Sequence, residues 1–187
     1  MARAALSRES VVDLAALVVD ECGPEALTLS AVAARAGVAT PSLYKHVRNL
    51  AELRELLSAR VTDEISALAG DAVLGRSGDE AVRALMNAWR AYVLRHPHRY
   101  AAVIQTPQPG TQAAGDRLLD ILLASLRAYG LGDSGTIHAA RCLRAAVHGF
   151  AVLESAGGFG LAESTDDSYD LLTRMIISGV ARADEDR

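Results

Sequence analysis

Residues 28–47, TLSAVAARAGVATPSLYKHV, constrain the fold most, because they predict two short helices joined by a tight glycine turn. Gly37 is placed to supply the left-handed C-cap that ends the first helix. Thr40 and Pro41 are typical of a helix start, so a second helix is expected over 41–47. This is the pattern of a helix-turn-helix, whose second helix enters the DNA major groove.

The charges around this stretch also favour DNA. No Asp or Glu occurs between Glu25 and Glu52, while Arg35, Lys45 and Arg48 lie in the same acid-free window. The whole chain carries a formal charge of −4, and its excess of acids lies beyond residue 60. Any contact with DNA phosphates is therefore expected to be local, on this one surface.

Composition predicts an all-α fold. Half of the residues are hydrophobic but only 4% are aromatic, so the core must be built from small aliphatic side chains on helices. Helical periodicity and glycine or proline breaks divide the chain into about nine helices. The expected segments are 7–22, 28–36, 41–47, 50–68, 79–95, 98–105, 111–129, 134–156 and 166–182. The glycine-containing break 70–78 is the expected domain joint, and Thr106–Gly110 is an expected loop.

Cysteine content and hydropathy bear on the compartment. Cys22 and Cys142 lie far apart in apolar helical windows, which predicts two reduced core thiols and no disulfide framework. No run of about 18 apolar residues is present, so no membrane span is expected. We therefore expect a cytoplasmic protein.

Several of these motifs resemble a known family. Ala33-x-x-Ala36-Gly37-Val38, followed by LYKHV and a leucine-rich helix, is similar to the DNA-binding domain of TetR-family transcriptional regulators. The resemblance implies a DNA-binding domain over 5–65 and a ligand-binding and dimerisation domain over 79–184. In the second domain, Trp89, His148 and Gly149 resemble the tryptophan, histidine and glycine that give the WHG type its name.

The helix-turn-helix offers two kinds of DNA contact. Side chains suited to reading bases are followed by imidazole and cationic groups suited to phosphates. The expected readers are Thr40, Pro41, Ser42 and Tyr44, and the expected phosphate anchors are Lys45, His46 and Arg48. The family resemblance implies that Thr28 and Ser30, at the start of the first helix of the motif, are phosphate anchors as well. Arg48 is expected to replace the lysine that relatives often carry where this chain has Leu50.

Each assignment has a structural alternative. Tyr44 could instead pack in the core between helices, and an exposed His46 on its own would mean little. Arg3 and Arg8 could follow the DNA as an arm or could be ordinary solvated charges.

A small-molecule site is expected in the second domain, where aromatic and imidazole groups are concentrated. The candidates are Trp89, Tyr92, His96, Tyr100, His148 and Phe150. The alternative is that these are the largest core residues of an alanine-rich bundle. His138 and Cys142 do not have the spacing of a metal motif, and we expect no metal or other cofactor. No GxSxG elbow or other catalytic constellation is present, so no catalytic residue is proposed.

The last two long helices predict a homodimer. Apolar residues follow one face of each helix and could pair across a two-fold axis. They are Ala140, Leu143, Val147 and Ala151 in one helix, and Leu172, Met175, Ile176 and Gly179 in the other. The dimer would place two recognition helices about 34–36 Å apart on a palindromic operator.

The sequence thus favours a dimeric, ligand-responsive DNA-binding regulator, most simply a repressor. Two alternatives remain: a helical enzyme or small-molecule carrier that binds no DNA, and a DNA-binding family member that has no ligand.

Overall fold

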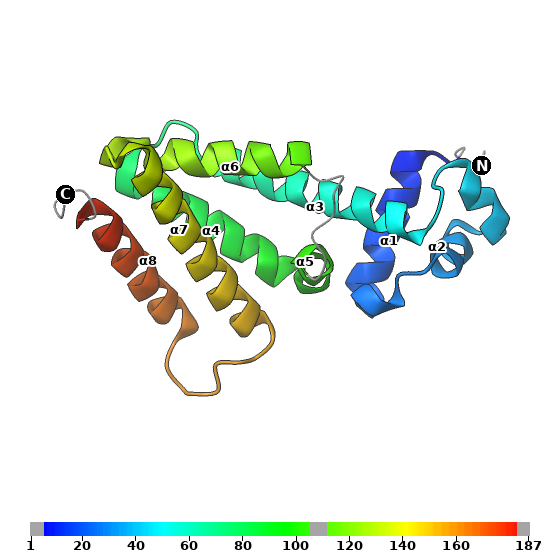
Figure 1. Ribbon diagram of the computed structural model, residues 1–187. Coiled ribbons are helices and arrows are strands. Elements are labelled where there is room, and N and C mark those ends of the chain that lie inside the picture. Colours follow the sequence, from blue (N-terminus) through cyan, green and yellow to red (C-terminus); the bar gives the residue numbers. More distant parts are fainter. Residues whose placement is uncertain (1–5, 105–111, 183–187) are drawn as a thin grey trace. The chain divides into compact units, whose positions relative to one another are not determined.

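The computed structural model describes residues 6–104 and 112–182, and all regular structure in these ranges is helical. The elements are α1 (Arg8–Cys22), η1 (Pro24–Ala26), α2 (Leu29–Ala36), η2 (Thr40–Lys45), α3 (Leu50–Val73), α4 (Gly78–Arg95), α5 (Pro97–Ile104), α6 (Gln112–Leu126), η4 (Arg127–Tyr129), α7 (Gly132–Ser155) and α8 (Thr165–Arg182) (Figure 1). The all-α prediction is confirmed. The expected loop Thr106–Gly110 lies outside the described residues.

The chain forms two compact units, which are described separately. Unit 1 comprises residues 1–63 and 96–115, and unit 2 comprises 64–95 and 116–187. The helix α3 belongs to both, and residues 96–115 group with unit 1 although they follow α4. The compact units therefore differ from the ranges 5–65 and 79–184, whose functional boundaries stay a prediction.

Capping explains where the first helices of unit 1 begin and end. The Thr28 hydroxyl accepts a hydrogen bond from the Ala31 N–H at 3.1 Å, as expected of an N-cap. Gly37 has a φ of 65° and ends α2 in the left-handed conformation that glycine adopts without strain. The turn between α2 and η2 is therefore built by local sequence, as the motif predicts.

The predicted recognition helix over 41–47 is wrong in type and extent. Thr40–Lys45 is a 3-10 helix. From the sequence, Thr40 could have capped this helix, but the N-cap is Ala39 and no side chain caps it. The His46 N–H donates to the Leu43 carbonyl three residues back, which is the tighter 3-10 bond. A segment of six residues is too short for an α-helix to gain much from its own hydrogen bonds, so the tertiary setting decides its form.

The helix α3 is longer than expected, because it continues through Gly70 to Val73. Asn49 caps it, with its side-chain oxygen accepting from the Glu52 N–H at 2.9 Å. Glycine costs about 1 kcal/mol in a helix interior, and burial of Ile65 and Ala69 on the same helix offsets that cost. The expected break over 70–78 is thus reduced to the turn 74–77.

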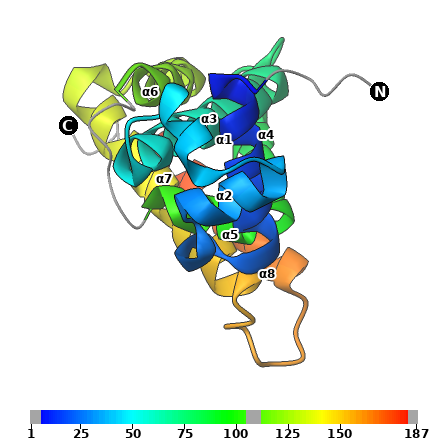
Figure 2. The same cartoon turned by 90° about the vertical axis from the view of Figure 1, so that its right-hand side faces the viewer.

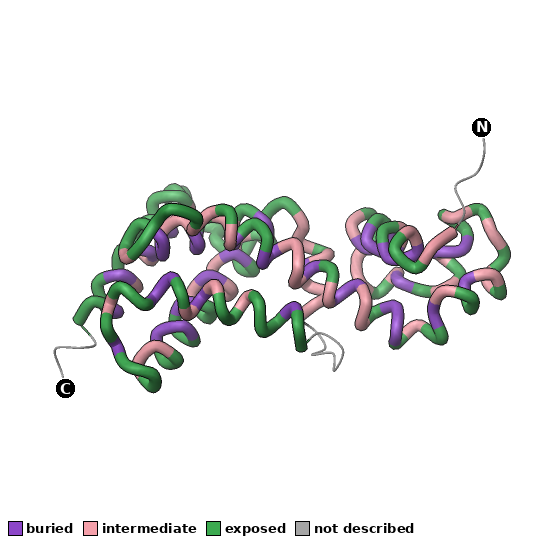
Figure 3. The backbone as a smooth tube through the Cα atoms, turned by 90° about the horizontal axis from the view of Figure 1, so that it is seen from above, coloured by how far each residue is buried: buried purple, intermediate pink, exposed green. Residues whose placement is uncertain are grey.

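In unit 2, α4, α7 and α8 lie side by side (Figures 1 and 2). Buried and exposed stretches alternate along each of these helices (Figure 3). The buried face of α4 includes Leu85, Met86 and Trp89, and that of α7 includes Leu143 and Val147. The buried face of each helix is therefore covered within unit 2 itself.

In unit 1, α5 packs on α1 and η1. The Arg99 guanidinium forms an ion pair with the Asp20 carboxylate, and Arg99 Nε donates to Asp20 at 3.1 Å. The His98 Nδ1 lies 3.0 Å from the Asp20 carbonyl oxygen. These contacts explain why a helix that follows α4 groups with α1.

The cysteine prediction needs correction. Cys22 and Cys142 are free thiols, as expected, but both are exposed rather than buried in the core. Each lies on the outer side of a helix whose opposite face is apolar, and an apolar window does not specify on which face a given thiol lies. Across the described residues, no helix is long and apolar enough to cross a membrane.

Candidate nucleic-acid interface

One side of the segment η2 packs in the core of unit 1, and its other side faces solvent. Leu43 and Val47, which are four residues apart and so share one side of a helix, are buried. Tyr44 is 57% exposed, and Lys45 is exposed as well. The core alternative for Tyr44 is therefore wrong, and the tyrosine ring is available to a partner.

The remaining predicted DNA residues lie in the same unit, on α2, on η2 and in the turn before α3. Pro41, Thr28 and Ser30 are exposed, whereas Thr40, Ser42 and His46 are half-buried. The Thr28 and Ser30 hydroxyls are 3.0 Å apart at the start of α2, which packs directly against η2. Two hydroxyls at a helix N-terminus have the chemistry to bind a phosphate.

Ion pairs engage two of the three cations in the acid-free window. Arg35 forms an ion pair with Glu21, and Arg48 Nε lies 3.1 Å from the Glu52 carboxylate. Within the described part of the chain Lys45 makes no ion pair. Of these three cations, Lys45 is therefore the one whose charge no carboxylate in the described residues shares.

Glu52 was not singled out from the sequence. Its carboxylate accepts the Arg48 backbone N–H at 2.6 Å and also pairs with Arg8, 44 residues away. The bond from the Arg48 backbone, more than either guanidinium, holds the pKa of the Glu52 carboxyl below its usual value. The signal available in the sequence is an acid three residues after the cap Asn49 and four after Arg48.

The candidate ligand residues are divided between the two units. Trp89 and Tyr92 are buried in unit 2, where the Tyr92 hydroxyl donates to the Glu64 carboxylate at 2.7 Å. His148 is half-buried there, and burial lowers its pKa. His96 and the buried Tyr100 belong to unit 1. A ligand role for these residues stays a prediction.

Phe150 takes part in an aromatic cluster around Arg90. Its ring centroid lies 5.0 Å from that of Tyr169 and 4.7 Å from that of Phe159. The Arg90 guanidinium lies over the Tyr169 ring at 4.6 Å and pairs with Glu154 and Asp166. Arg90 therefore ties α4 to both α7 and α8.

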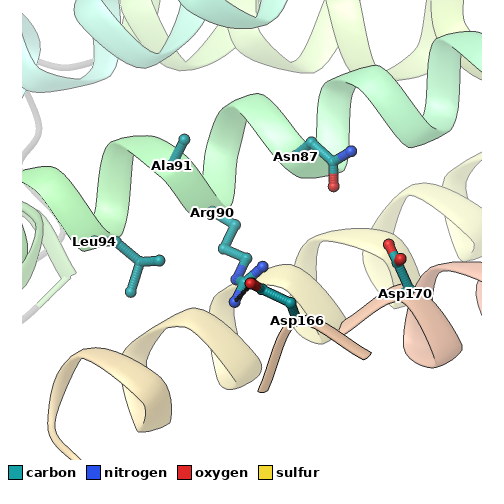
Figure 4. Close-up of a pocket in the computed structure, with 6 residues that line it drawn as sticks. All are labelled: Asn87, Arg90, Ala91, Leu94, Asp166 and Asp170. Atoms are coloured by element: carbon teal, nitrogen blue, oxygen red, sulfur yellow. Dashed lines mark ion pairs between the residues drawn. The ribbon is translucent and has the colours of Figure 1, made fainter. Parts of the chain in front are cut away.

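A groove of about 310 Å³ lies beside Arg90, between α4 and α8 (Figure 4). Its lining residues are Asn87, Arg90, Ala91, Leu94, Asp166 and Asp170. None of the six candidate ligand residues lines it. In the described residues, no three His, Cys, Asp or Glu side chains are grouped to hold a metal ion.

The expected dimer face on α7 is wrong in its residues. Ala140, Leu143, Val147 and Ala151 are buried inside unit 2, because α7 packs this face against α4. The exposed residues of α7 are mixed: Cys142, Ala145, Val152 and Leu153 are accompanied by His138, Arg141 and Arg144. On α8 the expected Met175 and Gly179 are exposed, as is Leu171, whereas Leu172 and Ile176 are half-buried.

Sequence comparison identifies both parts of the chain. Residues 11–57 match the family of bacterial regulatory proteins called the tetR family. Residues 82–176 match the family described as "Tetracyclin repressor-like, C-terminal domain". The WHG type remains a prediction.

Two curated relatives extend along nearly the whole chain. An uncharacterized HTH-type transcriptional regulator of Mycobacterium tuberculosis is 37% identical over 176 residues, which are 92% of this chain and 81% of that protein. Another from Bacillus subtilis, YobS, is 30% identical over 180 residues, which are 95% of this chain and 94% of that protein.

Solved structures share the fold. A TetR transcriptional regulator from Streptomyces coelicolor has a TM-score of 0.76 at 21% identity, covering 95% of this chain and 99% of that one. A TetR variant from Acinetobacter baumannii in complex with minocycline has a TM-score of 0.73 at 19% identity, covering 95% and 97%.

Proposed function

This chain belongs to the TetR family of bacterial transcriptional regulators, and we propose that it is a ligand-responsive repressor that binds a palindromic operator as a homodimer. It is a DNA-binding regulator and not an enzyme. The observation that carries the proposal is the exposure of Tyr44 and of Lys45, which makes no ion pair among the described residues, on a helix-turn-helix that is anchored by the buried Leu43. We place its action in the cytoplasm, where operator DNA is found.

In this proposal the residues around η2 divide the work of recognition. Tyr44 and Pro41, both exposed, contact base edges, and the half-buried Thr40 and Ser42 contribute hydroxyls. Thr28, Ser30, Lys45, His46 and Arg48 contact phosphates and hold the reader in register. A short 3-10 segment presents few side chains, so specificity is expected to depend on a few base pairs in each half-site.

Selection of genomic fragments by the purified full-length protein tests this proposal. We expect enrichment of one inexact palindrome whose half-site centres are about 10 base pairs, or a multiple of that, apart. Operator duplexes made from the selected sequence should bind far more tightly than scrambled duplexes of the same length. Fragments enriched without any shared sequence would contradict the proposal.

The dimer is proposed to form through the exposed faces of α7 and α8. On α7, Cys142 and Ala145 are three residues apart and Val152 follows two turns later, and on α8 Leu171 and Met175 are four residues apart. Met175 is 62% exposed, although a methionine favours burial in an apolar surface. Packing these faces against a second copy would form a four-helix interface.

The two native cysteines give a direct test of this dimer. Both thiols are exposed in the single chain, but only Cys142 lies on the proposed interface. We expect a maleimide reagent to modify Cys22 quickly and Cys142 slowly in the native protein, and both at similar rates in denaturant. Peptide mass spectrometry assigns the sites. Equal rates in the native protein would show that Cys142 lies outside the interface.

The proposed effector site lies in unit 2, among the buried aromatic residues of α4. We propose that a bound small molecule acts on the reading head, the DNA-contacting residues on and around η2, through α3, the helix that both units share. The minocycline complex of the Acinetobacter baumannii protein supports a ligand role for this fold. Trp89 is the sole tryptophan, so its fluorescence should report binding. A ligand that shifts this signal without changing operator affinity would disprove the coupling.

A further inference from the structure

The fold places the carboxylate of Glu52, the acid that ends the acid-free window, against Arg48 inside that window. The Glu52 side chain is only 10% exposed, and its two oxygens contact both Arg48 and Arg8. The start of α1 and the start of α3 therefore meet at one carboxylate, directly after the predicted reader.

The Glu52 carboxylate cannot easily turn away from these arginines. One oxygen accepts the Arg48 backbone N–H, and the Glu52 N–H is itself held by the Asn49 side chain. The guanidinium of Arg48 is nevertheless 81% exposed, and that of Arg8 is half-exposed. Both cations can thus approach a phosphate, but only with a fixed negative charge beside them.

We propose that Glu52 limits the sequence-independent attraction of the reading head for DNA and so acts as a specificity-determining residue. This inference rests on the proposed DNA-binding function. Non-specific affinity depends on the number of phosphates that cations neutralise, whereas base contacts discriminate between sequences. A carboxylate shared by two arginines lowers the non-specific affinity for DNA. Discrimination between sequences is left to the base contacts of the residues of η2.

The test is Glu52→Gln in the full-length protein. A glutamine oxygen can still accept a hydrogen bond from the Arg48 N–H, so the variant removes the negative charge and retains this hydrogen bond. Affinity is measured over a salt series for a 30-base-pair duplex of random sequence and for the selected operator duplex. For the random duplex we expect about threefold to tenfold tighter binding and a salt slope steeper by about 1–2 per dimer. Operator affinity should rise less, so the specificity ratio falls.

Asp13→Asn is the matched control. Asp13 pairs with Arg60 at 3.1 Å, so this change also neutralises an acid that links α1 to α3. Arg60 lies ten residues beyond the start of α3, about 15 Å along the helix. We expect little change in either DNA measurement. If Asp13→Asn reproduced the effect, net charge alone would explain it, and the assignment to Glu52 would be wrong.

A second comparison leaves Glu52 in place and so does not depend on the stability of the first variant. Lys45→Ala should reduce the salt slope for the random duplex more than Arg48→Gln does, because Glu52 already shares the Arg48 charge. Equal reductions would overturn the inference, as would unchanged or weaker random-duplex binding by Glu52→Gln. If the wild-type protein bound neither duplex, the proposed function itself would fail.

Discussion

Replacing Arg90 with methionine is expected to lower the free energy of unfolding by about 2 kcal/mol. The Arg90 side chain is 14% exposed, and it donates to the Glu154 carboxylate through Nε at 2.7 Å. Methionine fills much of the same volume, but it leaves Glu154, which is 12% exposed, without its cation. Urea denaturation at pH 7 measures the loss.

Asp166→Asn is the control for this variant. Asp166 also pairs with Arg90, at 2.8 Å, but its side chain is 83% exposed. Solvent screens such a pair, so the change should cost less than about 1 kcal/mol. A loss as large as that of Arg90→Met would mean that the exposed Arg90–Asp166 pair at the start of α8 contributes as much as the buried Arg90–Glu154 pair.

The effect of Arg90→Met should also depend on pH. The hydrogen bonds from Arg90 hold the pKa of the Glu154 carboxyl below its usual value of about 4.5. Stability from a lowered carboxyl pKa is fully present above the unfolded value and is lost as pH falls through the folded value. The difference between wild type and variant should therefore be largest near neutral pH and should shrink below about pH 4.5. A constant difference down to pH 3 would exclude this origin.

Tyr44→Ala is expected to weaken operator binding by about 100-fold. Each base contact of this kind is worth about 1–3 kcal/mol, and the proposed dimer presents the tyrosine twice. Because Tyr44 is exposed, its removal should leave the melting temperature nearly unchanged. The measurements are operator affinity at fixed salt and thermal unfolding. A large drop in stability would instead assign Tyr44 to packing.

Two further variants measure separately what the Tyr44 ring, the Tyr44 hydroxyl and the Lys45 charge contribute to DNA binding. Tyr44→Phe retains the ring, so any loss that it shares with Tyr44→Ala measures the hydroxyl contact. Lys45→Ala should weaken operator and random duplexes alike and reduce the salt slope by about one per subunit. Tyr44→Ala should leave the slope unchanged. If both changes altered the slope equally, the division between base reader and phosphate anchor would be wrong.

Local chemistry made much of unit 1 predictable. The Thr28 cap, the left-handed Gly37 and the Asn49 cap all act within a few residues of their own positions. The spacing of Leu43 and Val47 likewise predicted which side of η2 is buried. The all-α class and the family follow from such patterns, because a helix records its period and its ends in its own sequence.

The type of the reading helix was not predictable in the same way. Proline at the second position of Thr40–Lys45 is compatible with either an α-helix or a 3-10 helix. Packing of η2 against α2 selects between them. A six-residue segment has too few internal hydrogen bonds to decide its own geometry.

Tertiary structure alone determined which charges meet and which faces are covered. Arg8 pairs with Glu52, which is 44 residues away in the sequence, and Arg90 pairs with Glu154, which is 64 residues away. Periodicity predicted apolar stripes on α7, yet the stripe with Leu143 and Val147 packs inside unit 2 and leaves Val152 on the outside. A repeating pattern in one helix specifies a face but not the element that packs on it, because that choice depends on contacts between residues far apart in the chain.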